Sequence, residues 1–384
     1  MRQSNITRLI ACLLLMSACI VTLRITASLW VLQAGMGEWA VGLLLMTMSL
    51  APLWLSIWAG HLTDRIGFKR PSQIAIVLTV VGAMLPVLST NIWSLALACL
   101  IVGGGVSMNA VALQHVIGSL SQGDADLRRI YGWVALAPAL AGATVGVSAG
   151  LLIDHVGFSA AFFCAAVLPT IALWLVHVEV PTPHRDEARP ITSVWSAFKL
   201  FRMGAIRMVL LVNLLMAVSW DAHSFVVPIV GHFRSLTATE IGLVLSSFSA
   251  ATVLVRIVII RWSTHITETR VIQIAALVAG AGFATYQWLP TTLTLMVGSA
   301  VIGLALGSVQ PMLLSAIHQV TPEGLRGQAL GLRMFMMHIG TVGMPLIFAM
   351  LTQTLGSTAP MNIMAFVLLA MALALRFDLK PRVA

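Results

Sequence analysis

The sequence predicts an all-α membrane protein in which twelve transmembrane helices form two pseudo-symmetric bundles of six. Three observations support this fold class: the composition, the spacing of the apolar segments and an internal repeat. Of the 384 residues, 59% are hydrophobic and only 9% are charged, whereas about a quarter of the residues of a soluble domain are charged. A soluble core has no room for this much apolar surface, so a membrane protein is indicated.

The apolar segments follow one another along the whole chain, and each approaches the ~20 residues needed to cross a bilayer core. Lipid offers the backbone no hydrogen-bond partners, so each segment is expected to be a helix. The segments are continuous rather than alternating, which argues against a β-barrel. The twelve predicted spans are 9–32, 39–59, 72–90, 93–117, 130–152, 159–178, 206–230, 238–260, 271–289, 293–317, 328–352 and 359–377.

The two halves of the chain repeat each other at an offset of 200 residues. The segment EWAVGLLLMTMSLA at Glu38–Ala51 aligns without a gap with ATEIGLVLSSFSAA at Ala238–Ala251. A repeat of this length predicts two related bundles. The matched residues are Gly42 with Gly242, Leu43 with Leu243, Ser49 with Ser249, Ala51 with Ala251, Arg70 with Arg270 and Gly103 with Gly303.

We therefore expect three parts: a bundle at 1–178, a cytoplasmic linker at 179–205 and a second bundle at 206–384. The linker begins with the loop-like PTPHRDEARP and continues with ITSVWSAFKLFRMG. In the latter segment the apolar side chains share one helical face, which predicts a short helix lying on the membrane surface. These side chains are Val194, Trp195, Phe198 and Phe201.

The basic residues predict the orientation. With the N-terminus inside, 20 of the 22 Lys and Arg residues fall on cytoplasmic segments or the adjoining helix ends, and the exceptions are Arg234 and Arg24. This asymmetry predicts an inner-membrane protein with both termini in the cytoplasm. The basic residues are scattered over separate loops, so the net charge of +9 does not indicate nucleic-acid binding. The first apolar segment contains Arg24 and is too long for a signal peptide, so it is kept as a helix.

The loop after the second span carries the motif GHLTDRIGFKR at Gly60–Arg70. It closely resembles the signature loop of the major facilitator superfamily, Gly-x-x-x-Asp-Arg-x-Gly-x-Arg/Lys-Arg/Lys. Gly67 is expected to permit a tight turn. The resemblance implies a secondary transporter with a central cavity between its two bundles. The matching motif residues are Gly60, Asp64, Arg65, Gly67, Lys69 and Arg70.

The resemblance further implies that this loop locks a cytoplasmic gate, with Asp64 near the start of the eleventh helix, where the helix dipole favours an anion. Arg333 and Arg256 are candidate members of the same gate, with simple extension to the inner surface as the alternative for each. The corresponding loop of the second half has lost the motif, since Thr264 replaces Asp64 and Thr267 replaces Gly67 at the repeat offset.

Two features typical of the drug:proton antiporter branch are absent. Gly146 is followed by valine rather than proline, and the fourth span reads CLIVGGGVS in place of Arg-x-x-Gln-Gly-x-Gly. Small residues instead line the fifth and tenth spans at helical spacing, which predicts close helix packing there. These residues are Gly142, Gly146 and Gly150 in the fifth span and Ser299, Gly303 and Gly307 in the tenth.

Ionisable residues inside the spans are the strongest functional candidates, because burying them is costly. Arg24 lies 16 residues after Arg8, or ~24 Å along a helix. The repeat places Asp221 at a matching depth in the seventh span, with His223 and Trp220 beside it. We expect Arg24, Asp221 and His223 to form a proton-coupled outer gate. The alternative is that Arg24 bonds carbonyl groups and Asp221 bonds a serine of its own half.

Further polar residues are candidates for lining the cavity. They are Asn109 on the fourth span, Trp220 on the seventh, Gln310 on the tenth and His338 on the eleventh. The four cysteines have neither metal-site nor disulfide spacing, and no catalytic or nucleotide-binding motif appears. We therefore expect no catalytic residues, no metal and no cofactor, and an enzyme is disfavoured.

The expected function is proton-coupled export of small organic or amphipathic compounds. The alternative is proton-coupled uptake of a small organic anion, which Arg24 would attract. Fold alone does not decide between them. The expected partners are a small-molecule substrate, protons and the lipid bilayer, and the protein is expected to act as a monomer.

Overall fold

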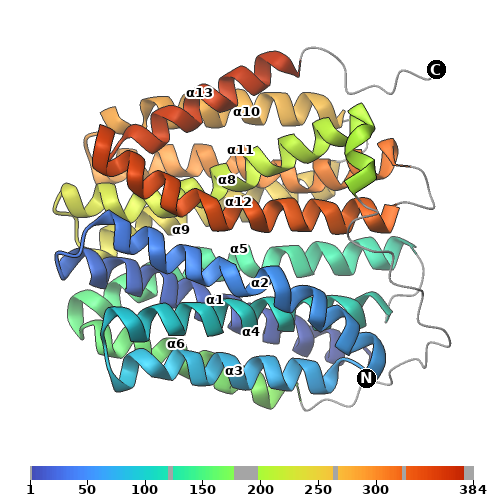
Figure 1. Cartoon of the computed structure of the whole chain (residues 1–384), viewed down its shortest axis with the longest axis horizontal. Helices are drawn as coiled ribbons and strands as arrows, with labels where there is room; N and C mark the ends of the chain where they lie inside the picture. The colour runs from blue at the N-terminus through green and yellow to red at the C-terminus, as the bar shows by residue number, and fades with distance from the viewer. Residues whose placement is uncertain (1, 120–123, 177–197, 263–266, 322–325, 376–384) are drawn as a thin grey trace. The chain divides into compact units, whose positions relative to one another are not determined.

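A computed structural model describes residues 2–119, 124–176, 198–262, 267–321 and 326–375 (Figure 1). Within these ranges the regular structure is entirely helical, with twelve α-helices and two short 3-10 helices. This confirms the predicted fold class. The first six α-helices are α1 (Arg2–Gln33), α2 (Glu38–Ile66), α3 (Lys69–Leu88), α4 (Ile92–Ser119), α5 (Asp124–His155) and α6 (Phe158–Leu175). The remaining elements are η1 (Phe198–Arg202), α8 (Gly204–Phe233), α9 (Ala238–Trp262), α10 (Glu268–Thr285), η3 (Tyr286–Trp288), α11 (Thr292–Val320), α12 (Arg326–Leu355) and α13 (Ala359–Ala374).

Eleven of these helices are long and apolar enough to cross a membrane, and the twelfth, α13, is a shorter apolar helix of 16 residues. Several helices contain an internal proline, including α2, α5 and α8. Proline is tolerated in membrane helices because neighbouring groups can satisfy the freed backbone carbonyl. The number and apolar length of these helices make the chain a multi-pass membrane protein.

The chain divides into two compact units. Unit 1 comprises Met1–Arg189 and Gly231–Ser246, and unit 2 comprises Pro190–Val230 and Ser247–Ala384. The last three residues of α8 and the start of α9 thus group with the first six helices, whereas the sequence predicted a second bundle that comprises all of 206–384. Most of the predicted surface helix lies outside the described residues, and its last part is η1.

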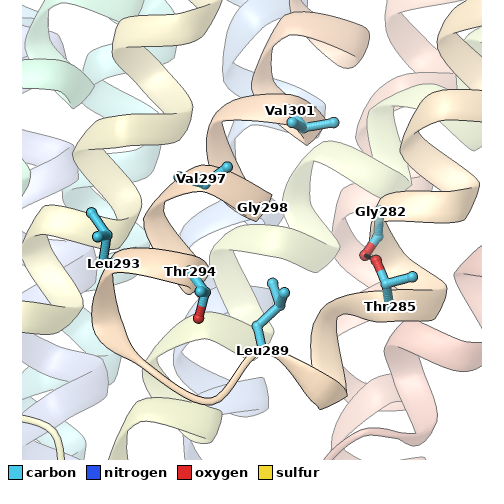
Figure 2. Close-up of a pocket in the computed structure, with 8 residues that line it drawn as sticks. All are labelled: Gly282, Thr285, Leu289, Leu293, Thr294, Val297, Gly298 and Val301. Carbon is cyan, nitrogen blue, oxygen red and sulfur yellow. Dashed lines mark hydrogen bonds between the residues drawn. The ribbon is translucent and has the colours of Figure 1, made fainter.

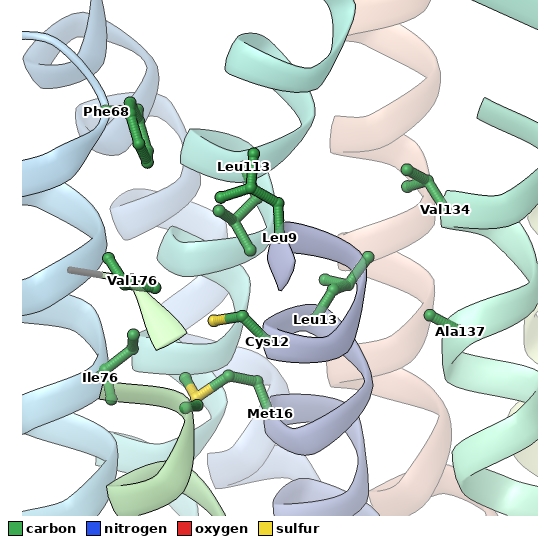
Figure 3. Close-up of a cluster of buried hydrophobic side chains, with 11 residues drawn as sticks. Leu9, Cys12, Leu13, Met16, Phe68, Ile76, Leu113, Val134, Ala137 and Val176 are labelled. Carbon is green, nitrogen blue, oxygen red and sulfur yellow. The ribbon is translucent and has the colours of Figure 1, made fainter. Parts of the chain in front are cut away.

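In unit 1, α4 packs against both α2 and α3, while α1 packs against α5 and α6, and α3 also contacts α6. A buried apolar cluster joins five of these helices (Figure 3). The side chains that α1 contributes lie between those of α3, α4 and α5, which come from distant parts of the sequence. The labelled side chains are Leu9, Cys12, Leu13, Met16, Phe68, Ile76, Leu113, Val134, Ala137 and Val176.

Unit 2 repeats the internal contacts of unit 1. Helix α10 packs against α11 and α13, just as its repeat mate α3 packs against α4 and α6. The aligned glycines also have the same role. Gly103 of α4 lies against the carbonyl oxygen of Met48, and Gly303 of α11 lies against that of Phe248, with no room for a Cβ at either position. The internal repeat read from the sequence is therefore a structural repeat.

Candidate functional site

The signature loop joins the end of α2 to the start of α3. Gly67 has a φ of 76° and donates its backbone N–H to the Thr63 carbonyl at 3.0 Å. This left-handed conformation favours glycine and confirms the predicted turn. Lys69 is half-buried and Arg70 is exposed. Gly60, Asp64 and Arg65 lie in the last two turns of α2, but their side-chain surroundings fall outside the described part of the structure.

The two candidates for the outer gate lie in different units. Arg24 is half-buried in α1 of unit 1, and Asp221 is half-buried in α8 of unit 2. Within unit 2, Asp221 lies within electrostatic range of His338 of α12, which is also half-buried. The pairing of Arg24 with Asp221 stays a prediction.

Asp221 has an exceptional position among the acidic residues. Within the described ranges, every other Asp or Glu lies no more than three residues from a helix end, including Asp64, Asp154 and Glu268. Asp221 instead lies 17 residues after the start of α8 and 12 before its end. An acid in the interior of a membrane helix is costly, and it is therefore a functional candidate.

His223, the third residue of the predicted outer gate, is enclosed in unit 2. Its ring is fully buried, and its Nε2 lies 2.9 Å from the Ser299 hydroxyl of α11. The same hydroxyl lies 2.8 Å from the Tyr286 hydroxyl of η3. The imidazole stacks on Phe248 of α9, with ring centroids 4.4 Å apart. Within the described residues, its Nδ1 has no hydrogen-bond partner. These contacts hold α8, α9, η3 and α11 together.

Arg256 connects this aromatic group to a polar side chain. Its guanidinium lies 5.9 Å from the centre of the Trp220 ring and donates to the Gln310 amide oxygen at 2.8 Å. Trp220 in turn meets Phe248 edge to face, at 4.7 Å between centroids. Arg256 is buried, whereas Gln310 is exposed and Trp220 is half-buried. Both Trp220 and Gln310, predicted to line the cavity, therefore contact the guanidinium of Arg256.

The second candidate arginine of unit 2, Arg333 in α12, is also buried. Its Nε donates to the side-chain oxygen of Asn213 in α8 at 2.8 Å. Neither the sequence repeat nor the signature motif indicated Asn213. The contact makes Arg333 part of the interior of unit 2 in this conformation.

Asn109, expected to line the cavity, has no exposed surface in unit 1. Its side-chain oxygen accepts a 2.6 Å hydrogen bond from Ser72 of α3, and its amide nitrogen makes a weak contact of 3.9 Å with the Cys12 sulfur of α1. In this conformation Asn109 therefore links α1, α3 and α4.

A close contact between α5 and α9 lies within unit 1. The Ser246 hydroxyl accepts from the backbone N–H of Val147 at 3.1 Å, and a Cβ at Gly146 would lie 2.7 Å from the Gly242 carbonyl oxygen. At the end of α5, the Asp154 carboxylate accepts from the backbone N–H groups of Ala238 and Thr239 at 3.1 and 2.7 Å. Asp154 thereby caps the start of α9, a favourable site for an anion. The small-residue seam predicted in α5 is confirmed.

An apolar groove of about 320 Å³ lies between α10 and α11 (Figure 2). Leu293, Val297 and Val301 line it and are exposed, while Thr285 and Thr294 contribute its polar side chains. With no ionisable lining residue, the groove lacks a group to orient a charged substrate. Among the described residues, no cluster of three or more His, Cys, Asp or Glu is arranged to hold a metal ion.

The sequence matches the model of the Major Facilitator Superfamily over residues 9–233 and 209–384. The chain belongs to the Major Facilitator Superfamily. The match confirms the family suggested by the signature loop. This membership makes it a membrane transporter of the secondary type rather than an enzyme.

Solved structures with the same fold include transporters of several kinds. The human organic anion transporter MFSD10 (TETRAN) is 14% identical, with a TM-score of 0.76 over 97% of this chain and 99% of that one. A POT family transporter in complex with a thioalcohol-conjugated peptide is 11% identical, with a TM-score of 0.81 over 97% and 95%. The nucleoside transporter NupG is 13% identical, with a TM-score of 0.78 over 97% and 98%. At these identities the likeness shows the fold alone.

Proposed function

We propose that the protein is a proton-coupled secondary transporter that exports small organic or amphipathic compounds across the inner membrane by alternating access. Both termini lie in the cytoplasm in this proposal, as the distribution of Lys and Arg indicates. The position of Asp221 carries the proposal. It is the one acid in a helix interior among the described residues, and an intramembrane carboxylate is a natural proton carrier.

In this proposal Asp221 exchanges its proton as the transporter alternates. His338 lies within electrostatic range of it inside unit 2, and Arg24 is its proposed partner in the closed outer gate. Release from a cation favours proton uptake by a carboxylate, whereas pairing favours proton loss. Proton binding is thereby linked to gate opening. His223, fully buried and bonded to Ser299, is proposed to support the helix that carries Asp221.

The signature loop has a separate proposed role as the cytoplasmic gate. Asp64 is proposed to interact with the N-terminal end of α12, with the basic residues of the motif holding the loop inside. Arg256 and Arg333 were included in this gate on sequence grounds. Their side-chain contacts with Gln310 and Asn213 suggest that they also act inside unit 2.

Uptake of a small organic anion is the second candidate function. The observation that favours it is the presence of two buried arginines in unit 2, Arg256 and Arg333. The two functions use the same proton carrier and differ in the direction of transport.

Transport by the purified protein in liposomes tests the proposal. Labelled candidate compounds are offered with an imposed pH gradient, and accumulation is compared with counterflow exchange at equal pH. Asp221→Asn should abolish accumulation against the gradient but retain counterflow. Glu38→Gln, which alters an acid at the start of α2, is the matched control and should retain both. Accumulation at wild-type levels by Asp221→Asn would refute proton coupling through this residue.

A further inference from the structure

The contact between Arg333 and Asn213 offers more hydrogen-bond donors than acceptors. Both residues are buried in unit 2, with exposed fractions of 5% and 3%. The Arg333 Nε donates to the Asn213 Oδ1 at 2.8 Å. A guanidinium has five N–H donors and no acceptor. Among the described residues its other hydrogen bond is a weak one from Nη1 to the sulfur of Met334 at 3.9 Å.

The amide nitrogen of Asn213 is a further donor at this place. It is buried, and within the described residues it has no hydrogen-bond partner. Burying a polar group without a partner is unfavourable, and burying a cation is more so. Since the amide nitrogen and the guanidinium are both donors, and the guanidinium carries a positive charge, a negatively charged acceptor is the ligand that would satisfy them.

Extension of Arg333 to the membrane surface does not explain this geometry. Arg333 lies seven residues after the start of α12, and Asn213 lies nine residues after the start of α8. These intervals correspond to ~10 and ~14 Å of helix. The guanidinium thus binds a side chain that itself lies more than two turns inside its helix, whereas an arginine reaching for the surface would turn toward the helix end.

The helices that carry the two residues also approach each other further along α12. A Cβ at Gly340 of α12 would lie 2.5 Å from a methyl carbon of Leu214 and 3.0 Å from one of Val218. Helices α8 and α12 therefore approach closely beside the Arg333–Asn213 contact.

We propose that Arg333 and Asn213 form an anion-binding subsite, and that the transported compounds carry a carboxylate, sulfonate or phosphate group. This inference rests on the proposed transport of small organic compounds and specifies their charge. The exposed side chain of Met334, adjacent to the guanidinium, provides a flexible apolar contact for the rest of such a molecule. An anionic lipid head group has the same chemistry and is the competing source of the ligand.

Thermal unfolding of the purified protein in phosphatidylcholine nanodiscs tests the subsite without a transport assay. The probes are benzoate, benzenesulfonate and phenyl phosphate, with benzamide as the neutral counterpart of benzoate. We expect at least one anion to raise the unfolding temperature in a saturable manner, with benzamide ineffective. Arg333→Gln should weaken anion binding about tenfold or more, because a charge-assisted hydrogen bond is lost. Arg207→Gln, at an exposed position of the same helix as Asn213, should bind like wild type.

Asn213→Asp separates a ligand site from a merely structural contact. The new carboxylate would accept from Arg333 and occupy the place of the ligand, so the folded protein should lose its response to the anions. Retention of the wild-type response by Asn213→Asp or Arg333→Gln would overturn the proposal, as would equal effects of benzoate and benzamide. If phosphatidylglycerol in the nanodiscs gives the same stabilisation and abolishes the response to the probes, a lipid is the ligand and the substrate inference is wrong.

Failure of the subsite is distinguishable from failure of the proposed function. Loss of proton-driven accumulation in Asp221→Asn with normal anion binding would support both ideas. Anion binding at Arg333 combined with proton-independent transport would sustain the subsite and refute proton coupling.

Discussion

Gly150→Ala should shift the protein away from the conformation in which α5 and α9 are in contact. A Cβ at Gly150 would lie 2.5 Å from the carbonyl oxygen of Ala238 and 2.7 Å from the Cα of Thr239. Real Cβ atoms essentially never approach other atoms within 3.0 Å, so the two backbones must separate by about half an ångström. The obstructing atoms belong to the backbone and cannot rotate away.

The size of the effect follows from two opposing terms. Alanine improves helix propensity by ~1 kcal/mol over glycine, but it does so in every conformation in which α5 stays helical. Overpacking costs ~1–3 kcal/mol and applies only while α5 and α9 are in contact. The equilibrium constant between the conformations with and without the α5–α9 contact should therefore change by the overpacking term alone, a factor of about 5–150. Alternating access requires contacts between the two six-helix halves to open and close, and α5 and α9 come from different halves of the sequence.

Pulsed electron paramagnetic resonance can measure this shift. Spin labels at Val156 and Phe233, which are 68% and 58% exposed, report on the end of α5 and the chain entering α9. The four native cysteines are replaced by alanine in all variants. Wild type should show the short distance of the contact, and Gly150→Ala should add a longer one. Gly343→Ala is the control, because a Cβ there has no atom within 4 Å. Identical distance distributions for the two alanine variants would refute the reasoning.

Two further predictions concern the signature loop and the His223 cluster. Asp64→Asn should lower the transport rate in liposomes while leaving substrate affinity within a few-fold, because the residue is proposed to lock a conformation rather than to bind substrate. Thr264→Ala, at its repeat mate, should have near wild-type rates, and an equal loss would show that both loops act as gates. Ser299→Ala removes the hydroxyl shared by His223 and Tyr286, and it should lower the free energy of unfolding by ~1–3 kcal/mol, as followed by denaturant titration in detergent. An unchanged unfolding free energy would mean that the cluster contributes no stability.

The sequence by itself determined the properties that the membrane imposes on each helix separately. A bilayer core requires a minimum apolar length and internal backbone bonding, so the spans could be counted before any packing was known. The turn at Gly67 follows from the local sequence, and the equivalence of Gly103 and Gly303 follows from the repeat, so neither depends on knowing the packing. The small residues of α5 also showed in advance that another helix would approach there.

Only the tertiary structure decided which helices and side chains meet. The seam of α5 gave no sign that its partner is the start of α9, or that Asp154 caps that helix. Likewise, Arg333 and Asn213 are 120 residues apart, and Asn109 was expected to face open space but bonds Ser72. The physical reason is that depth in the membrane follows from counting along a helix, whereas the direction of a side chain around the helix axis depends on the packing of all its neighbours.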